Sequence, residues 1–141
     1  MSYLTNADIE LRLGSQLYVE LTDDAGTGSA DPAKVEEARL GAEGEADSYL
    51  AGRYQTPVDA SAAPSIAAVL KSFVLDIAIY RLHRRKPPVP ADVSRSYVEA
   101  VTWLSRVASS VAHLPLVSEA ASSARSAGPS REMTRAGLRD L

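Results

Sequence analysis

The sequence predicts an all-α protein: a small bundle of about four main helices in residues 1–114, followed by an extended C-terminal tail in residues 115–141. Three observations predict this fold class. Apolar residues recur every three or four positions in three long segments, which is the spacing of one helix face. Helix-start signals precede these segments, and glycine or proline follows them. The length of 141 residues suits a single core.

A short helix is expected to begin near Thr5, because its hydroxyl and the Asp8 carboxylate form a capping-box pattern. Gly14 interrupts the apolar spacing that follows. A second short helix is therefore expected over residues 15–21, with Leu17, Tyr18 and Leu21 facing the core.

An acidic loop comes next. Residues 23–29 interleave carboxylates with glycines, as calcium loops do. The twelfth position is Lys34 or Val35, however, where a calcium loop requires a bidentate glutamate. We expect no metal ion in this loop and no cofactor in the chain.

A long helix is expected to start at Asp31-Pro32, an N-cap aspartate before a proline at the first helical position. Gly41 and Gly44 each cost about 1 kcal/mol relative to alanine inside a helix. Close packing against a neighbouring helix would explain them. Gly52 is the expected end. The inward stripe is expected to comprise Val35, Ala38, Ala42, Ala46, Tyr49 and Leu50.

The most apolar segment is expected to form the central helix of the bundle. It should begin at Pro64 or Ser65 and end before Pro87-Pro88, which prevent its continuation. Its apolar face is expected to comprise Ile66, Val69, Leu70, Phe73, Val74, Ile77 and Tyr80.

Asp76 lies near that face. A buried carboxylate without a cation is costly. We therefore expect a structural ion pair between Asp76 and either Arg53 or Arg81.

The central helix ends in a basic run at residues 81–86. Cations at a helix C-terminus interact favourably with the helix dipole, which gives the run a structural explanation. The alternative is that the run contacts phosphate groups. Both interpretations remain open at this point.

A further helix is expected after the two prolines, capped by Asp92 or Ser94. Trp103 flanks its apolar stripe, which should pack on the central helix. The stripe is expected to comprise Tyr97, Val101, Leu104, Ala108 and Val111.

The tail is rich in alanine, serine and arginine and has no core stripe. We expect it to dock on a partner or on a neighbouring copy of the chain. The residues expected to make that contact are Arg125, Arg131, Met133, Arg135, Leu138, Arg139 and Leu141.

The sequence carries little sign of catalysis. There is no cysteine, no phosphate-binding loop and no transmembrane segment. His83 and His113 have no nucleophile or carboxylate at a spacing typical of a catalytic site, so both are expected to be surface histidines. The start of the chain does not resemble a secretion signal, and a cytoplasmic origin is expected. We expect a protein that is not an enzyme and does not bind a membrane.

Charge is distributed unevenly along the chain. Residues 1–50 contain eleven acidic residues against Arg12, Lys34 and Arg39, whereas the remainder is basic. Such polarity suits contact between copies or with an anionic polymer. A chance grouping of solvated side chains is the simpler explanation.

Several segments, in order, resemble the Mu-like prophage head-tail adaptor family over roughly residues 3–114. The most specific part is the Asp-x-Tyr-Leu-x-Gly-Arg-Tyr pattern from Asp47 to Tyr54. Two further parts are residues 76–82, Asp-Ile-Ala-Ile-Tyr-Arg-Leu, and residues 97–104, Tyr-Val-Glu-Ala-Val-Thr-Trp-Leu. None of these is a catalytic signature.

The resemblance implies a structural protein of the phage neck, made in the host cytoplasm and incorporated into the virion. Such adaptors form a ring, usually twelvefold, below the portal protein. The ring extends the DNA channel, contacts the genome transiently and receives the next neck or tail-completion protein. By analogy, the tail would insert against the portal.

A cyclic ring needs two unlike patches on each copy. We expect acidic residues of one copy to face basic residues of the next. The expected interface residues are Glu36, Glu37 and Glu43 on one side and Arg84, Arg85 and Arg95 on the other.

Two other functions remain open. One is a small helical nucleic-acid-binding regulator that uses Arg81, Arg84, Arg85 and Lys86. The other is an enzyme dependent on His83.

Overall fold

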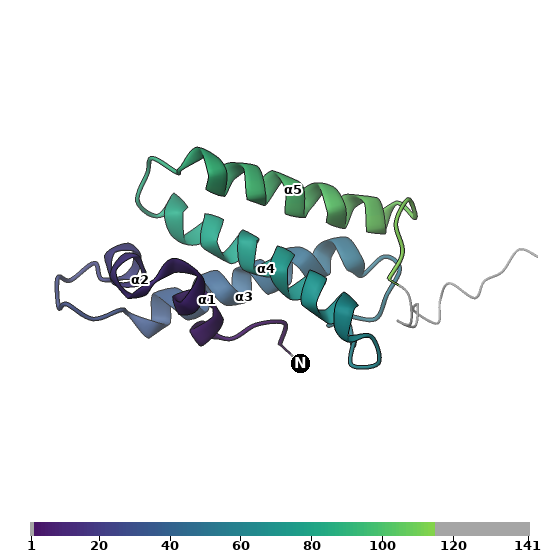
Figure 1. Ribbon diagram of the computed structural model, residues 1–141, viewed down its shortest axis with the longest axis horizontal. Coiled ribbons are helices and arrows are strands. Elements are labelled where there is room, and N and C mark those ends of the chain that lie inside the picture. The colour runs from purple at the N-terminus through teal and green to yellow at the C-terminus, as the bar shows by residue number, and fades with distance from the viewer. Residues whose placement is uncertain (1, 115–141) are drawn as a thin grey trace, which may run out of the picture.

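The computed structural model describes residues 2–114, which form five helices, three long and two short (Figure 1). The helices are α1 (Asn6–Leu13), α2 (Ser15–Thr22), α3 (Pro32–Leu50), α4 (Pro64–Arg84) and α5 (Ala91–Ala108). This confirms the all-α fold class. The predicted tail, residues 115–141, lies outside the described residues.

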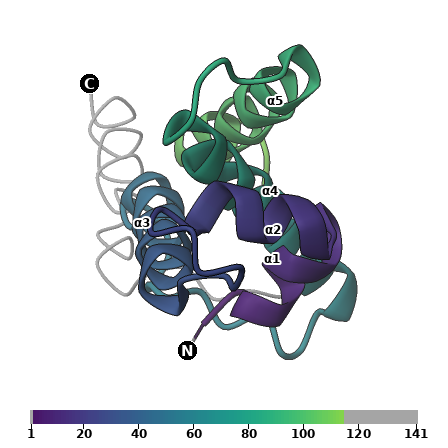
Figure 2. The ribbon, with the colours of Figure 1, turned by 90° about the vertical axis from the view of Figure 1, so that its left-hand side faces the viewer.

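The three long helices form the body of the bundle. α4 packs against both α3 and α5, and α3 also touches α5. The short helices α1 and α2 pack on α3 and α4 toward one end of the molecule (Figures 1 and 2). α4 is therefore the central helix, as predicted.

Local signals place the starts of α1 and α3. The Thr5 side chain accepts a hydrogen bond from the Asp8 amide, and the Asp8 carboxylate accepts one from the Thr5 amide at 2.7 Å. Asp31 caps α3 by accepting from the Ala33 amide at 3.0 Å. The capping box and the N-cap aspartate are confirmed.

The predicted cap of α5 is wrong. α5 begins at Ala91, directly after Pro90, so Asp92 and Ser94 lie inside its first turn. The Ser94 amide already donates to the Pro90 carbonyl at 3.1 Å. Pro90 is the N-cap residue, with an extended ψ of 146°, and no side chain caps the helix.

The core confirms the stripe of α3, with Tyr49 only partly buried. The predicted face of α4 is wrong at Val69, which is 38% exposed. The buried surface of α4 is also wider than predicted, because helices cover it on several sides, and it includes Leu75, Ala78, Ile79 and Leu82.

The stripe of α5 is wrong in part. Its fully buried members are Ala100, Leu104 and Val107, whereas Val111 lies beyond the helix and is 72% exposed. Small Ala100 is buried in place of the larger Val101, so the apolar spacing alone pointed to the wrong register.

Gly41 allows a close approach between α3 and α4. The Arg81 side chain of α4 crosses it to donate from Nη2 to Glu45 Oε1 at 2.8 Å. A Cβ atom at position 41 would come within 2.7 Å of Arg81 Nη1. Close packing therefore explains Gly41. At Gly44 a Cβ would meet no described atom within 4 Å.

The two glycines give a matched prediction. Gly44→Ala should raise the free energy of unfolding by about 1 kcal/mol, because alanine favours the helix. Gly41→Ala should lose that gain, because its methyl group displaces the Arg81 guanidinium from Glu45. Urea unfolding followed by circular dichroism measures both. Equal stabilisation by the two substitutions would contradict this account of Gly41.

Candidate interaction surface

The basic run at the end of α4 binds the end of another helix. Arg85 donates to the Leu21 carbonyl and to the Asp24 carboxylate. Lys86 Nζ donates to the Glu20 carbonyl at 2.6 Å. Glu20 and Leu21 belong to the last turn of α2, whose carbonyls lack partners within the helix. Arg85 and Lys86 therefore cap α2 and hold the acidic loop beside α4.

A hollow of about 300 Å³ lies between α3 and α4. Arg84 at its edge is exposed, and its guanidinium lies 5.7 Å from the centre of the Tyr80 ring. Neither Arg84 nor Lys34 forms an ion pair with another residue of the 2–114 region. The hollow is therefore cationic. Its lining comprises Lys34, Glu37, Ala38, Arg81, Arg84 and Arg85.

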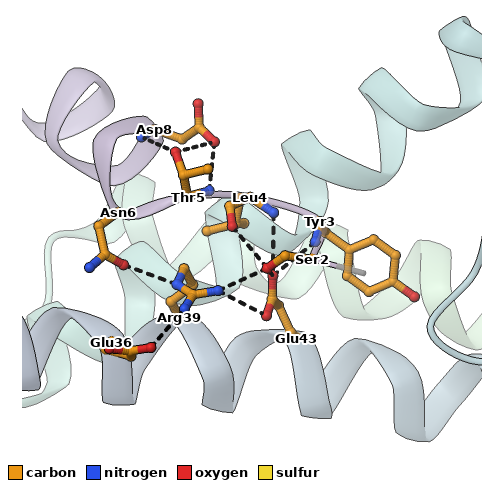
Figure 3. Close-up of polar contacts among 9 residues, drawn as sticks. All are labelled: Ser2, Tyr3, Leu4, Thr5, Asn6, Asp8, Glu36, Arg39 and Glu43. Carbon is orange, nitrogen blue, oxygen red and sulfur yellow. Dashed lines mark hydrogen bonds and ion pairs between the residues drawn. The ribbon is translucent and has the colours of Figure 1, made fainter. Parts of the chain in front are cut away.

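Glu43, one of the predicted interface residues, is engaged within the chain. Its carboxylate accepts hydrogen bonds from Ser2 Oγ at 2.7 Å and from the Tyr3 amide at 2.9 Å (Figure 3). Arg39 pairs with the same carboxylate at 3.3 Å. With its side chain only 12% exposed, Glu43 anchors the N-terminal segment to α3 rather than facing solvent.

The other predicted interface residues lie in three places. Glu36 pairs with Arg39 at 3.0 Å, yet its side chain remains 53% exposed. Glu37 lines the same hollow as Arg84 and Arg85, so the structure brings these three together on one patch. Arg95 is exposed on α5.

The predicted partners of Asp76 are wrong. Arg12 of α1 pairs with Asp76 at 2.9 Å, whereas Arg81 pairs with Glu45. Arg53 Nη1 donates to the carbonyls of Val107 at 2.7 Å and Ala112 at 3.0 Å, at the end of α5. The reason is the position of α1, which packs across α4.

Burial raises the pKa of Asp76 above its ordinary value, although the Arg12 guanidinium opposes the shift. The pKa of this carboxyl therefore remains elevated despite its partner. Its ion pair fixes α1 on α4.

His83 is buried rather than on the surface as predicted, with 6% of its area exposed. It borders a hollow of about 230 Å³ between the short helices, α4 and α5. Burial lowers the pKa of His83, and the negative charge of Asp92 opposes that shift. The other polar residues around this hollow are Arg12, Asp76 and Ser96.

The Asp47–Tyr54 pattern was the most specific part of the resemblance. Its polar residues form hydrogen bonds that hold distant segments of the chain together. Asp47 accepts a hydrogen bond from the Tyr3 hydroxyl at 2.6 Å. The Tyr54 hydroxyl accepts one from the Leu114 amide at 3.1 Å, and Arg53 holds the end of α5. Because all these partners are more than 40 residues away along the chain, nothing local in the sequence identified them.

These contacts define an all-helical scaffold in which several charged side chains join one helix to another. Within residues 2–114, no three metal-ligating side chains are grouped as an ion would require. No helix of that region is long and apolar enough to cross a membrane.

Residues 3–132 match the model of a family described as Bacteriophage Mu, Gp36. The chain therefore belongs to this bacteriophage family. The match extends beyond Leu114, where the resemblance recognised in the sequence ended, into the C-terminal segment. A search of curated proteins finds no match.

The buried histidine gives a prediction about pH. Because folding lowers the pKa of His83 below its ordinary 6.5, its neutral form stabilises the fold above that pH. This contribution should be lost as the pH falls from 6.5 through the lower folded value. A proton NMR titration should show His83 titrating below 6.5, and Asp92→Asn should lower its pKa further. An unchanged pKa in the Asp92→Asn variant would contradict the role given to Asp92.

Proposed function

We propose that this protein is a structural head-tail connector of a tailed phage, forming a ring below the portal. The observation that carries the proposal is its membership of the bacteriophage Mu Gp36 family over most of the chain. The described structure supports a scaffold role, because several of its charged side chains hold helices together. The proposed location is the neck of the virion, where the ring would extend the DNA channel.

The copy-to-copy contact is proposed to be electrostatic. Of the residues expected there, Arg84 and Arg95 are exposed and have no ion pair in the described part of the chain. Glu36 and Glu37 are exposed on α3. A ring closes when one patch meets a different patch on the next copy. We propose that Arg95 of one copy faces Glu36 and Glu37 of the next. Arg84 lines the same hollow as Glu37 and is therefore assigned to the same side of the contact as the two glutamates.

Arg85 and Glu43 are left out of this contact. Each has partners within its own chain, so its substitution would disturb the fold as well as any interface. They serve better as indicators of fold integrity than as tests of assembly.

A charge-reversal experiment tests the ring contact. Arg95→Glu should weaken assembly about tenfold, because like charges would then face each other. Analytical ultracentrifugation with and without portal rings measures the effect. The matched control is Arg106→Glu, which reverses an exposed arginine elsewhere on α5.

Charge exchange sharpens that test. Glu36→Arg with Glu37→Arg should restore assembly when mixed with the Arg95→Glu chain. Assembly that survives reversal, or that no exchange rescues, would count against the proposed pairing.

The proposed partners are other copies of the chain, the portal protein and the next neck or tail-completion protein. Residues 115–141 are proposed to reach the portal. Of the seven residues predicted for that contact, all lie outside the described residues. Genomic DNA would pass through the ring and touch it only transiently.

Removal of the tail tests the portal contact. A chain ending at Leu114 should keep its helical circular dichroism signal, because it retains all five described helices and the hydrogen bond from the Leu114 amide to the Tyr54 hydroxyl. Its affinity for purified portal rings should fall by at least about tenfold, as expected when an interface loses its anchoring residues. Full binding by the shortened chain would place the portal contact in the bundle.

A nucleic-acid-binding regulator is the second candidate, favoured by the cationic hollow. Three of its four proposed contact residues are already engaged: Arg81 with Glu45, Arg85 with Asp24 and Lys86 with Glu20. Of these four residues, only Arg84 is exposed and has no ion pair in the described region. Salt-dependent duplex binding by the monomer, abolished by Arg84→Glu, would favour this candidate.

A further inference from the structure

The hollow between α3 and α4 brings together cationic side chains from two helices. Its charged lining comprises Lys34 and Glu37 of α3 with Arg81, Arg84 and Arg85 at the end of α4. Its volume of about 300 Å³ is enough for a small polyatomic ion. Four cations and one carboxylate thus border a single space.

Two of these cations are held in place by acidic residues of the chain. Arg81 Nη2 pairs with Glu45 Oε1 at 2.8 Å, and Arg85 pairs with Asp24. A side chain that is already fixed loses less conformational entropy when it binds a ligand. The two arginines are therefore preorganised donors at the wall of the hollow.

The other two cations have no partner of opposite charge. Neither Lys34 nor Arg84 forms an ion pair with another of residues 2–114. Glu37 adds one negative charge to the lining and has no ion pair in that region either. The lining therefore keeps an excess of positive charge after its internal ion pairs are counted.

Arg81 also has a donor that the described chain does not use. Its Nε atom is buried and has no hydrogen-bond partner among the described residues. Buried N–H groups in folded proteins are nearly always hydrogen-bonded, and a charged donor left without an acceptor is costly. An acceptor in the hollow would satisfy this group.

The hollow beside His83 has the opposite charge balance. Its arginine, Arg12, pairs with Asp76 at 2.9 Å, and Asp92 adds a second carboxylate. An anion in that space would meet more negative than positive charge while His83 is neutral. The contrast assigns anion binding to the hollow between α3 and α4.

We propose that the hollow between α3 and α4 binds a phosphate group, with Lys34 and Arg84 supplying the charge and Arg81 Nε donating a hydrogen bond. A phosphate group has at least three acceptor oxygens, so it accepts from cations on two helices at once, whereas a carboxylate has two. The site requires neither a nucleic acid nor the connector function. Free phosphate and the phosphates of a nucleic-acid backbone share this chemistry.

A phosphate titration of the full-length chain tests the site, with sodium chloride at equal ionic strength as the reference. In a proton–nitrogen NMR spectrum, the Arg81 Nε–H signal should shift and reach saturation with phosphate but not with chloride. An unmoved signal, or the same shift with both salts, would overturn the proposal.

Substitutions separate the site from general charge effects. Arg84→Gln should weaken phosphate binding about tenfold, because a charge-assisted hydrogen bond is lost. Glu37→Gln should strengthen binding about threefold, because it removes the opposing charge. The matched control is Arg106→Gln, at an exposed arginine of α5, which should leave the affinity unchanged. Circular dichroism verifies each fold, and equal weakening by the two arginine substitutions would overturn the proposal.

Competition identifies the source of the phosphate group. A short DNA duplex that displaces phosphate from the hollow would point to the nucleic-acid backbone, and a duplex that leaves phosphate bound would point to the free ion. Both results support the site. None of these measurements uses portal rings or assembled copies, so their failure is separate from failure of the connector function.

Discussion

Glu45 joins the three long helices of the bundle. Its carboxylate accepts hydrogen bonds from Arg81 of α4 at 2.8 Å and from the Tyr97 hydroxyl of α5 at 2.7 Å. The Tyr97 ring stacks on Tyr80 with ring centres 4.0 Å apart. The hydrogen bond to Glu45, together with burial, raises the pKa of Tyr97 to about 12. A partly buried carboxylate needs such donors. Gly41 leaves the space through which the Arg81 side chain reaches Glu45.

The same requirement accounts for the other polar contacts. Asp76 forms an ion pair with Arg12. Arg85 and Lys86 donate hydrogen bonds to carbonyls in the last turn of α2, which have no partners within that helix. In each case a charged group at the end or edge of one helix satisfies a group on another. The ionic residues thus set the relative positions of helices, while the apolar stripes supply most of the burial.

Sequence reasoning succeeded where the physics is local. The capping box involves only Thr5 and Asp8, and the start of α3 involves only Asp31 and Pro32. Both helix starts could therefore be predicted from neighbouring residues. The stripe of α3 was also predicted, because five of its six residues are buried at a regular spacing. The candidate interface was less predictable. Whether Glu43 faces solvent depends on a segment 40 residues away, and no spacing rule reports such a contact.

Both ends of the described chain are attached to the second half of α3 and the residues just after it. The first segment is bound by Glu43 and Asp47, and Leu114 by Tyr54. Ends that are held by neighbouring parts of one segment can be joined by a linker with little distortion. A circularly permuted version of residues 2–114, opened in the exposed loop between α2 and α3, should therefore retain the bundle.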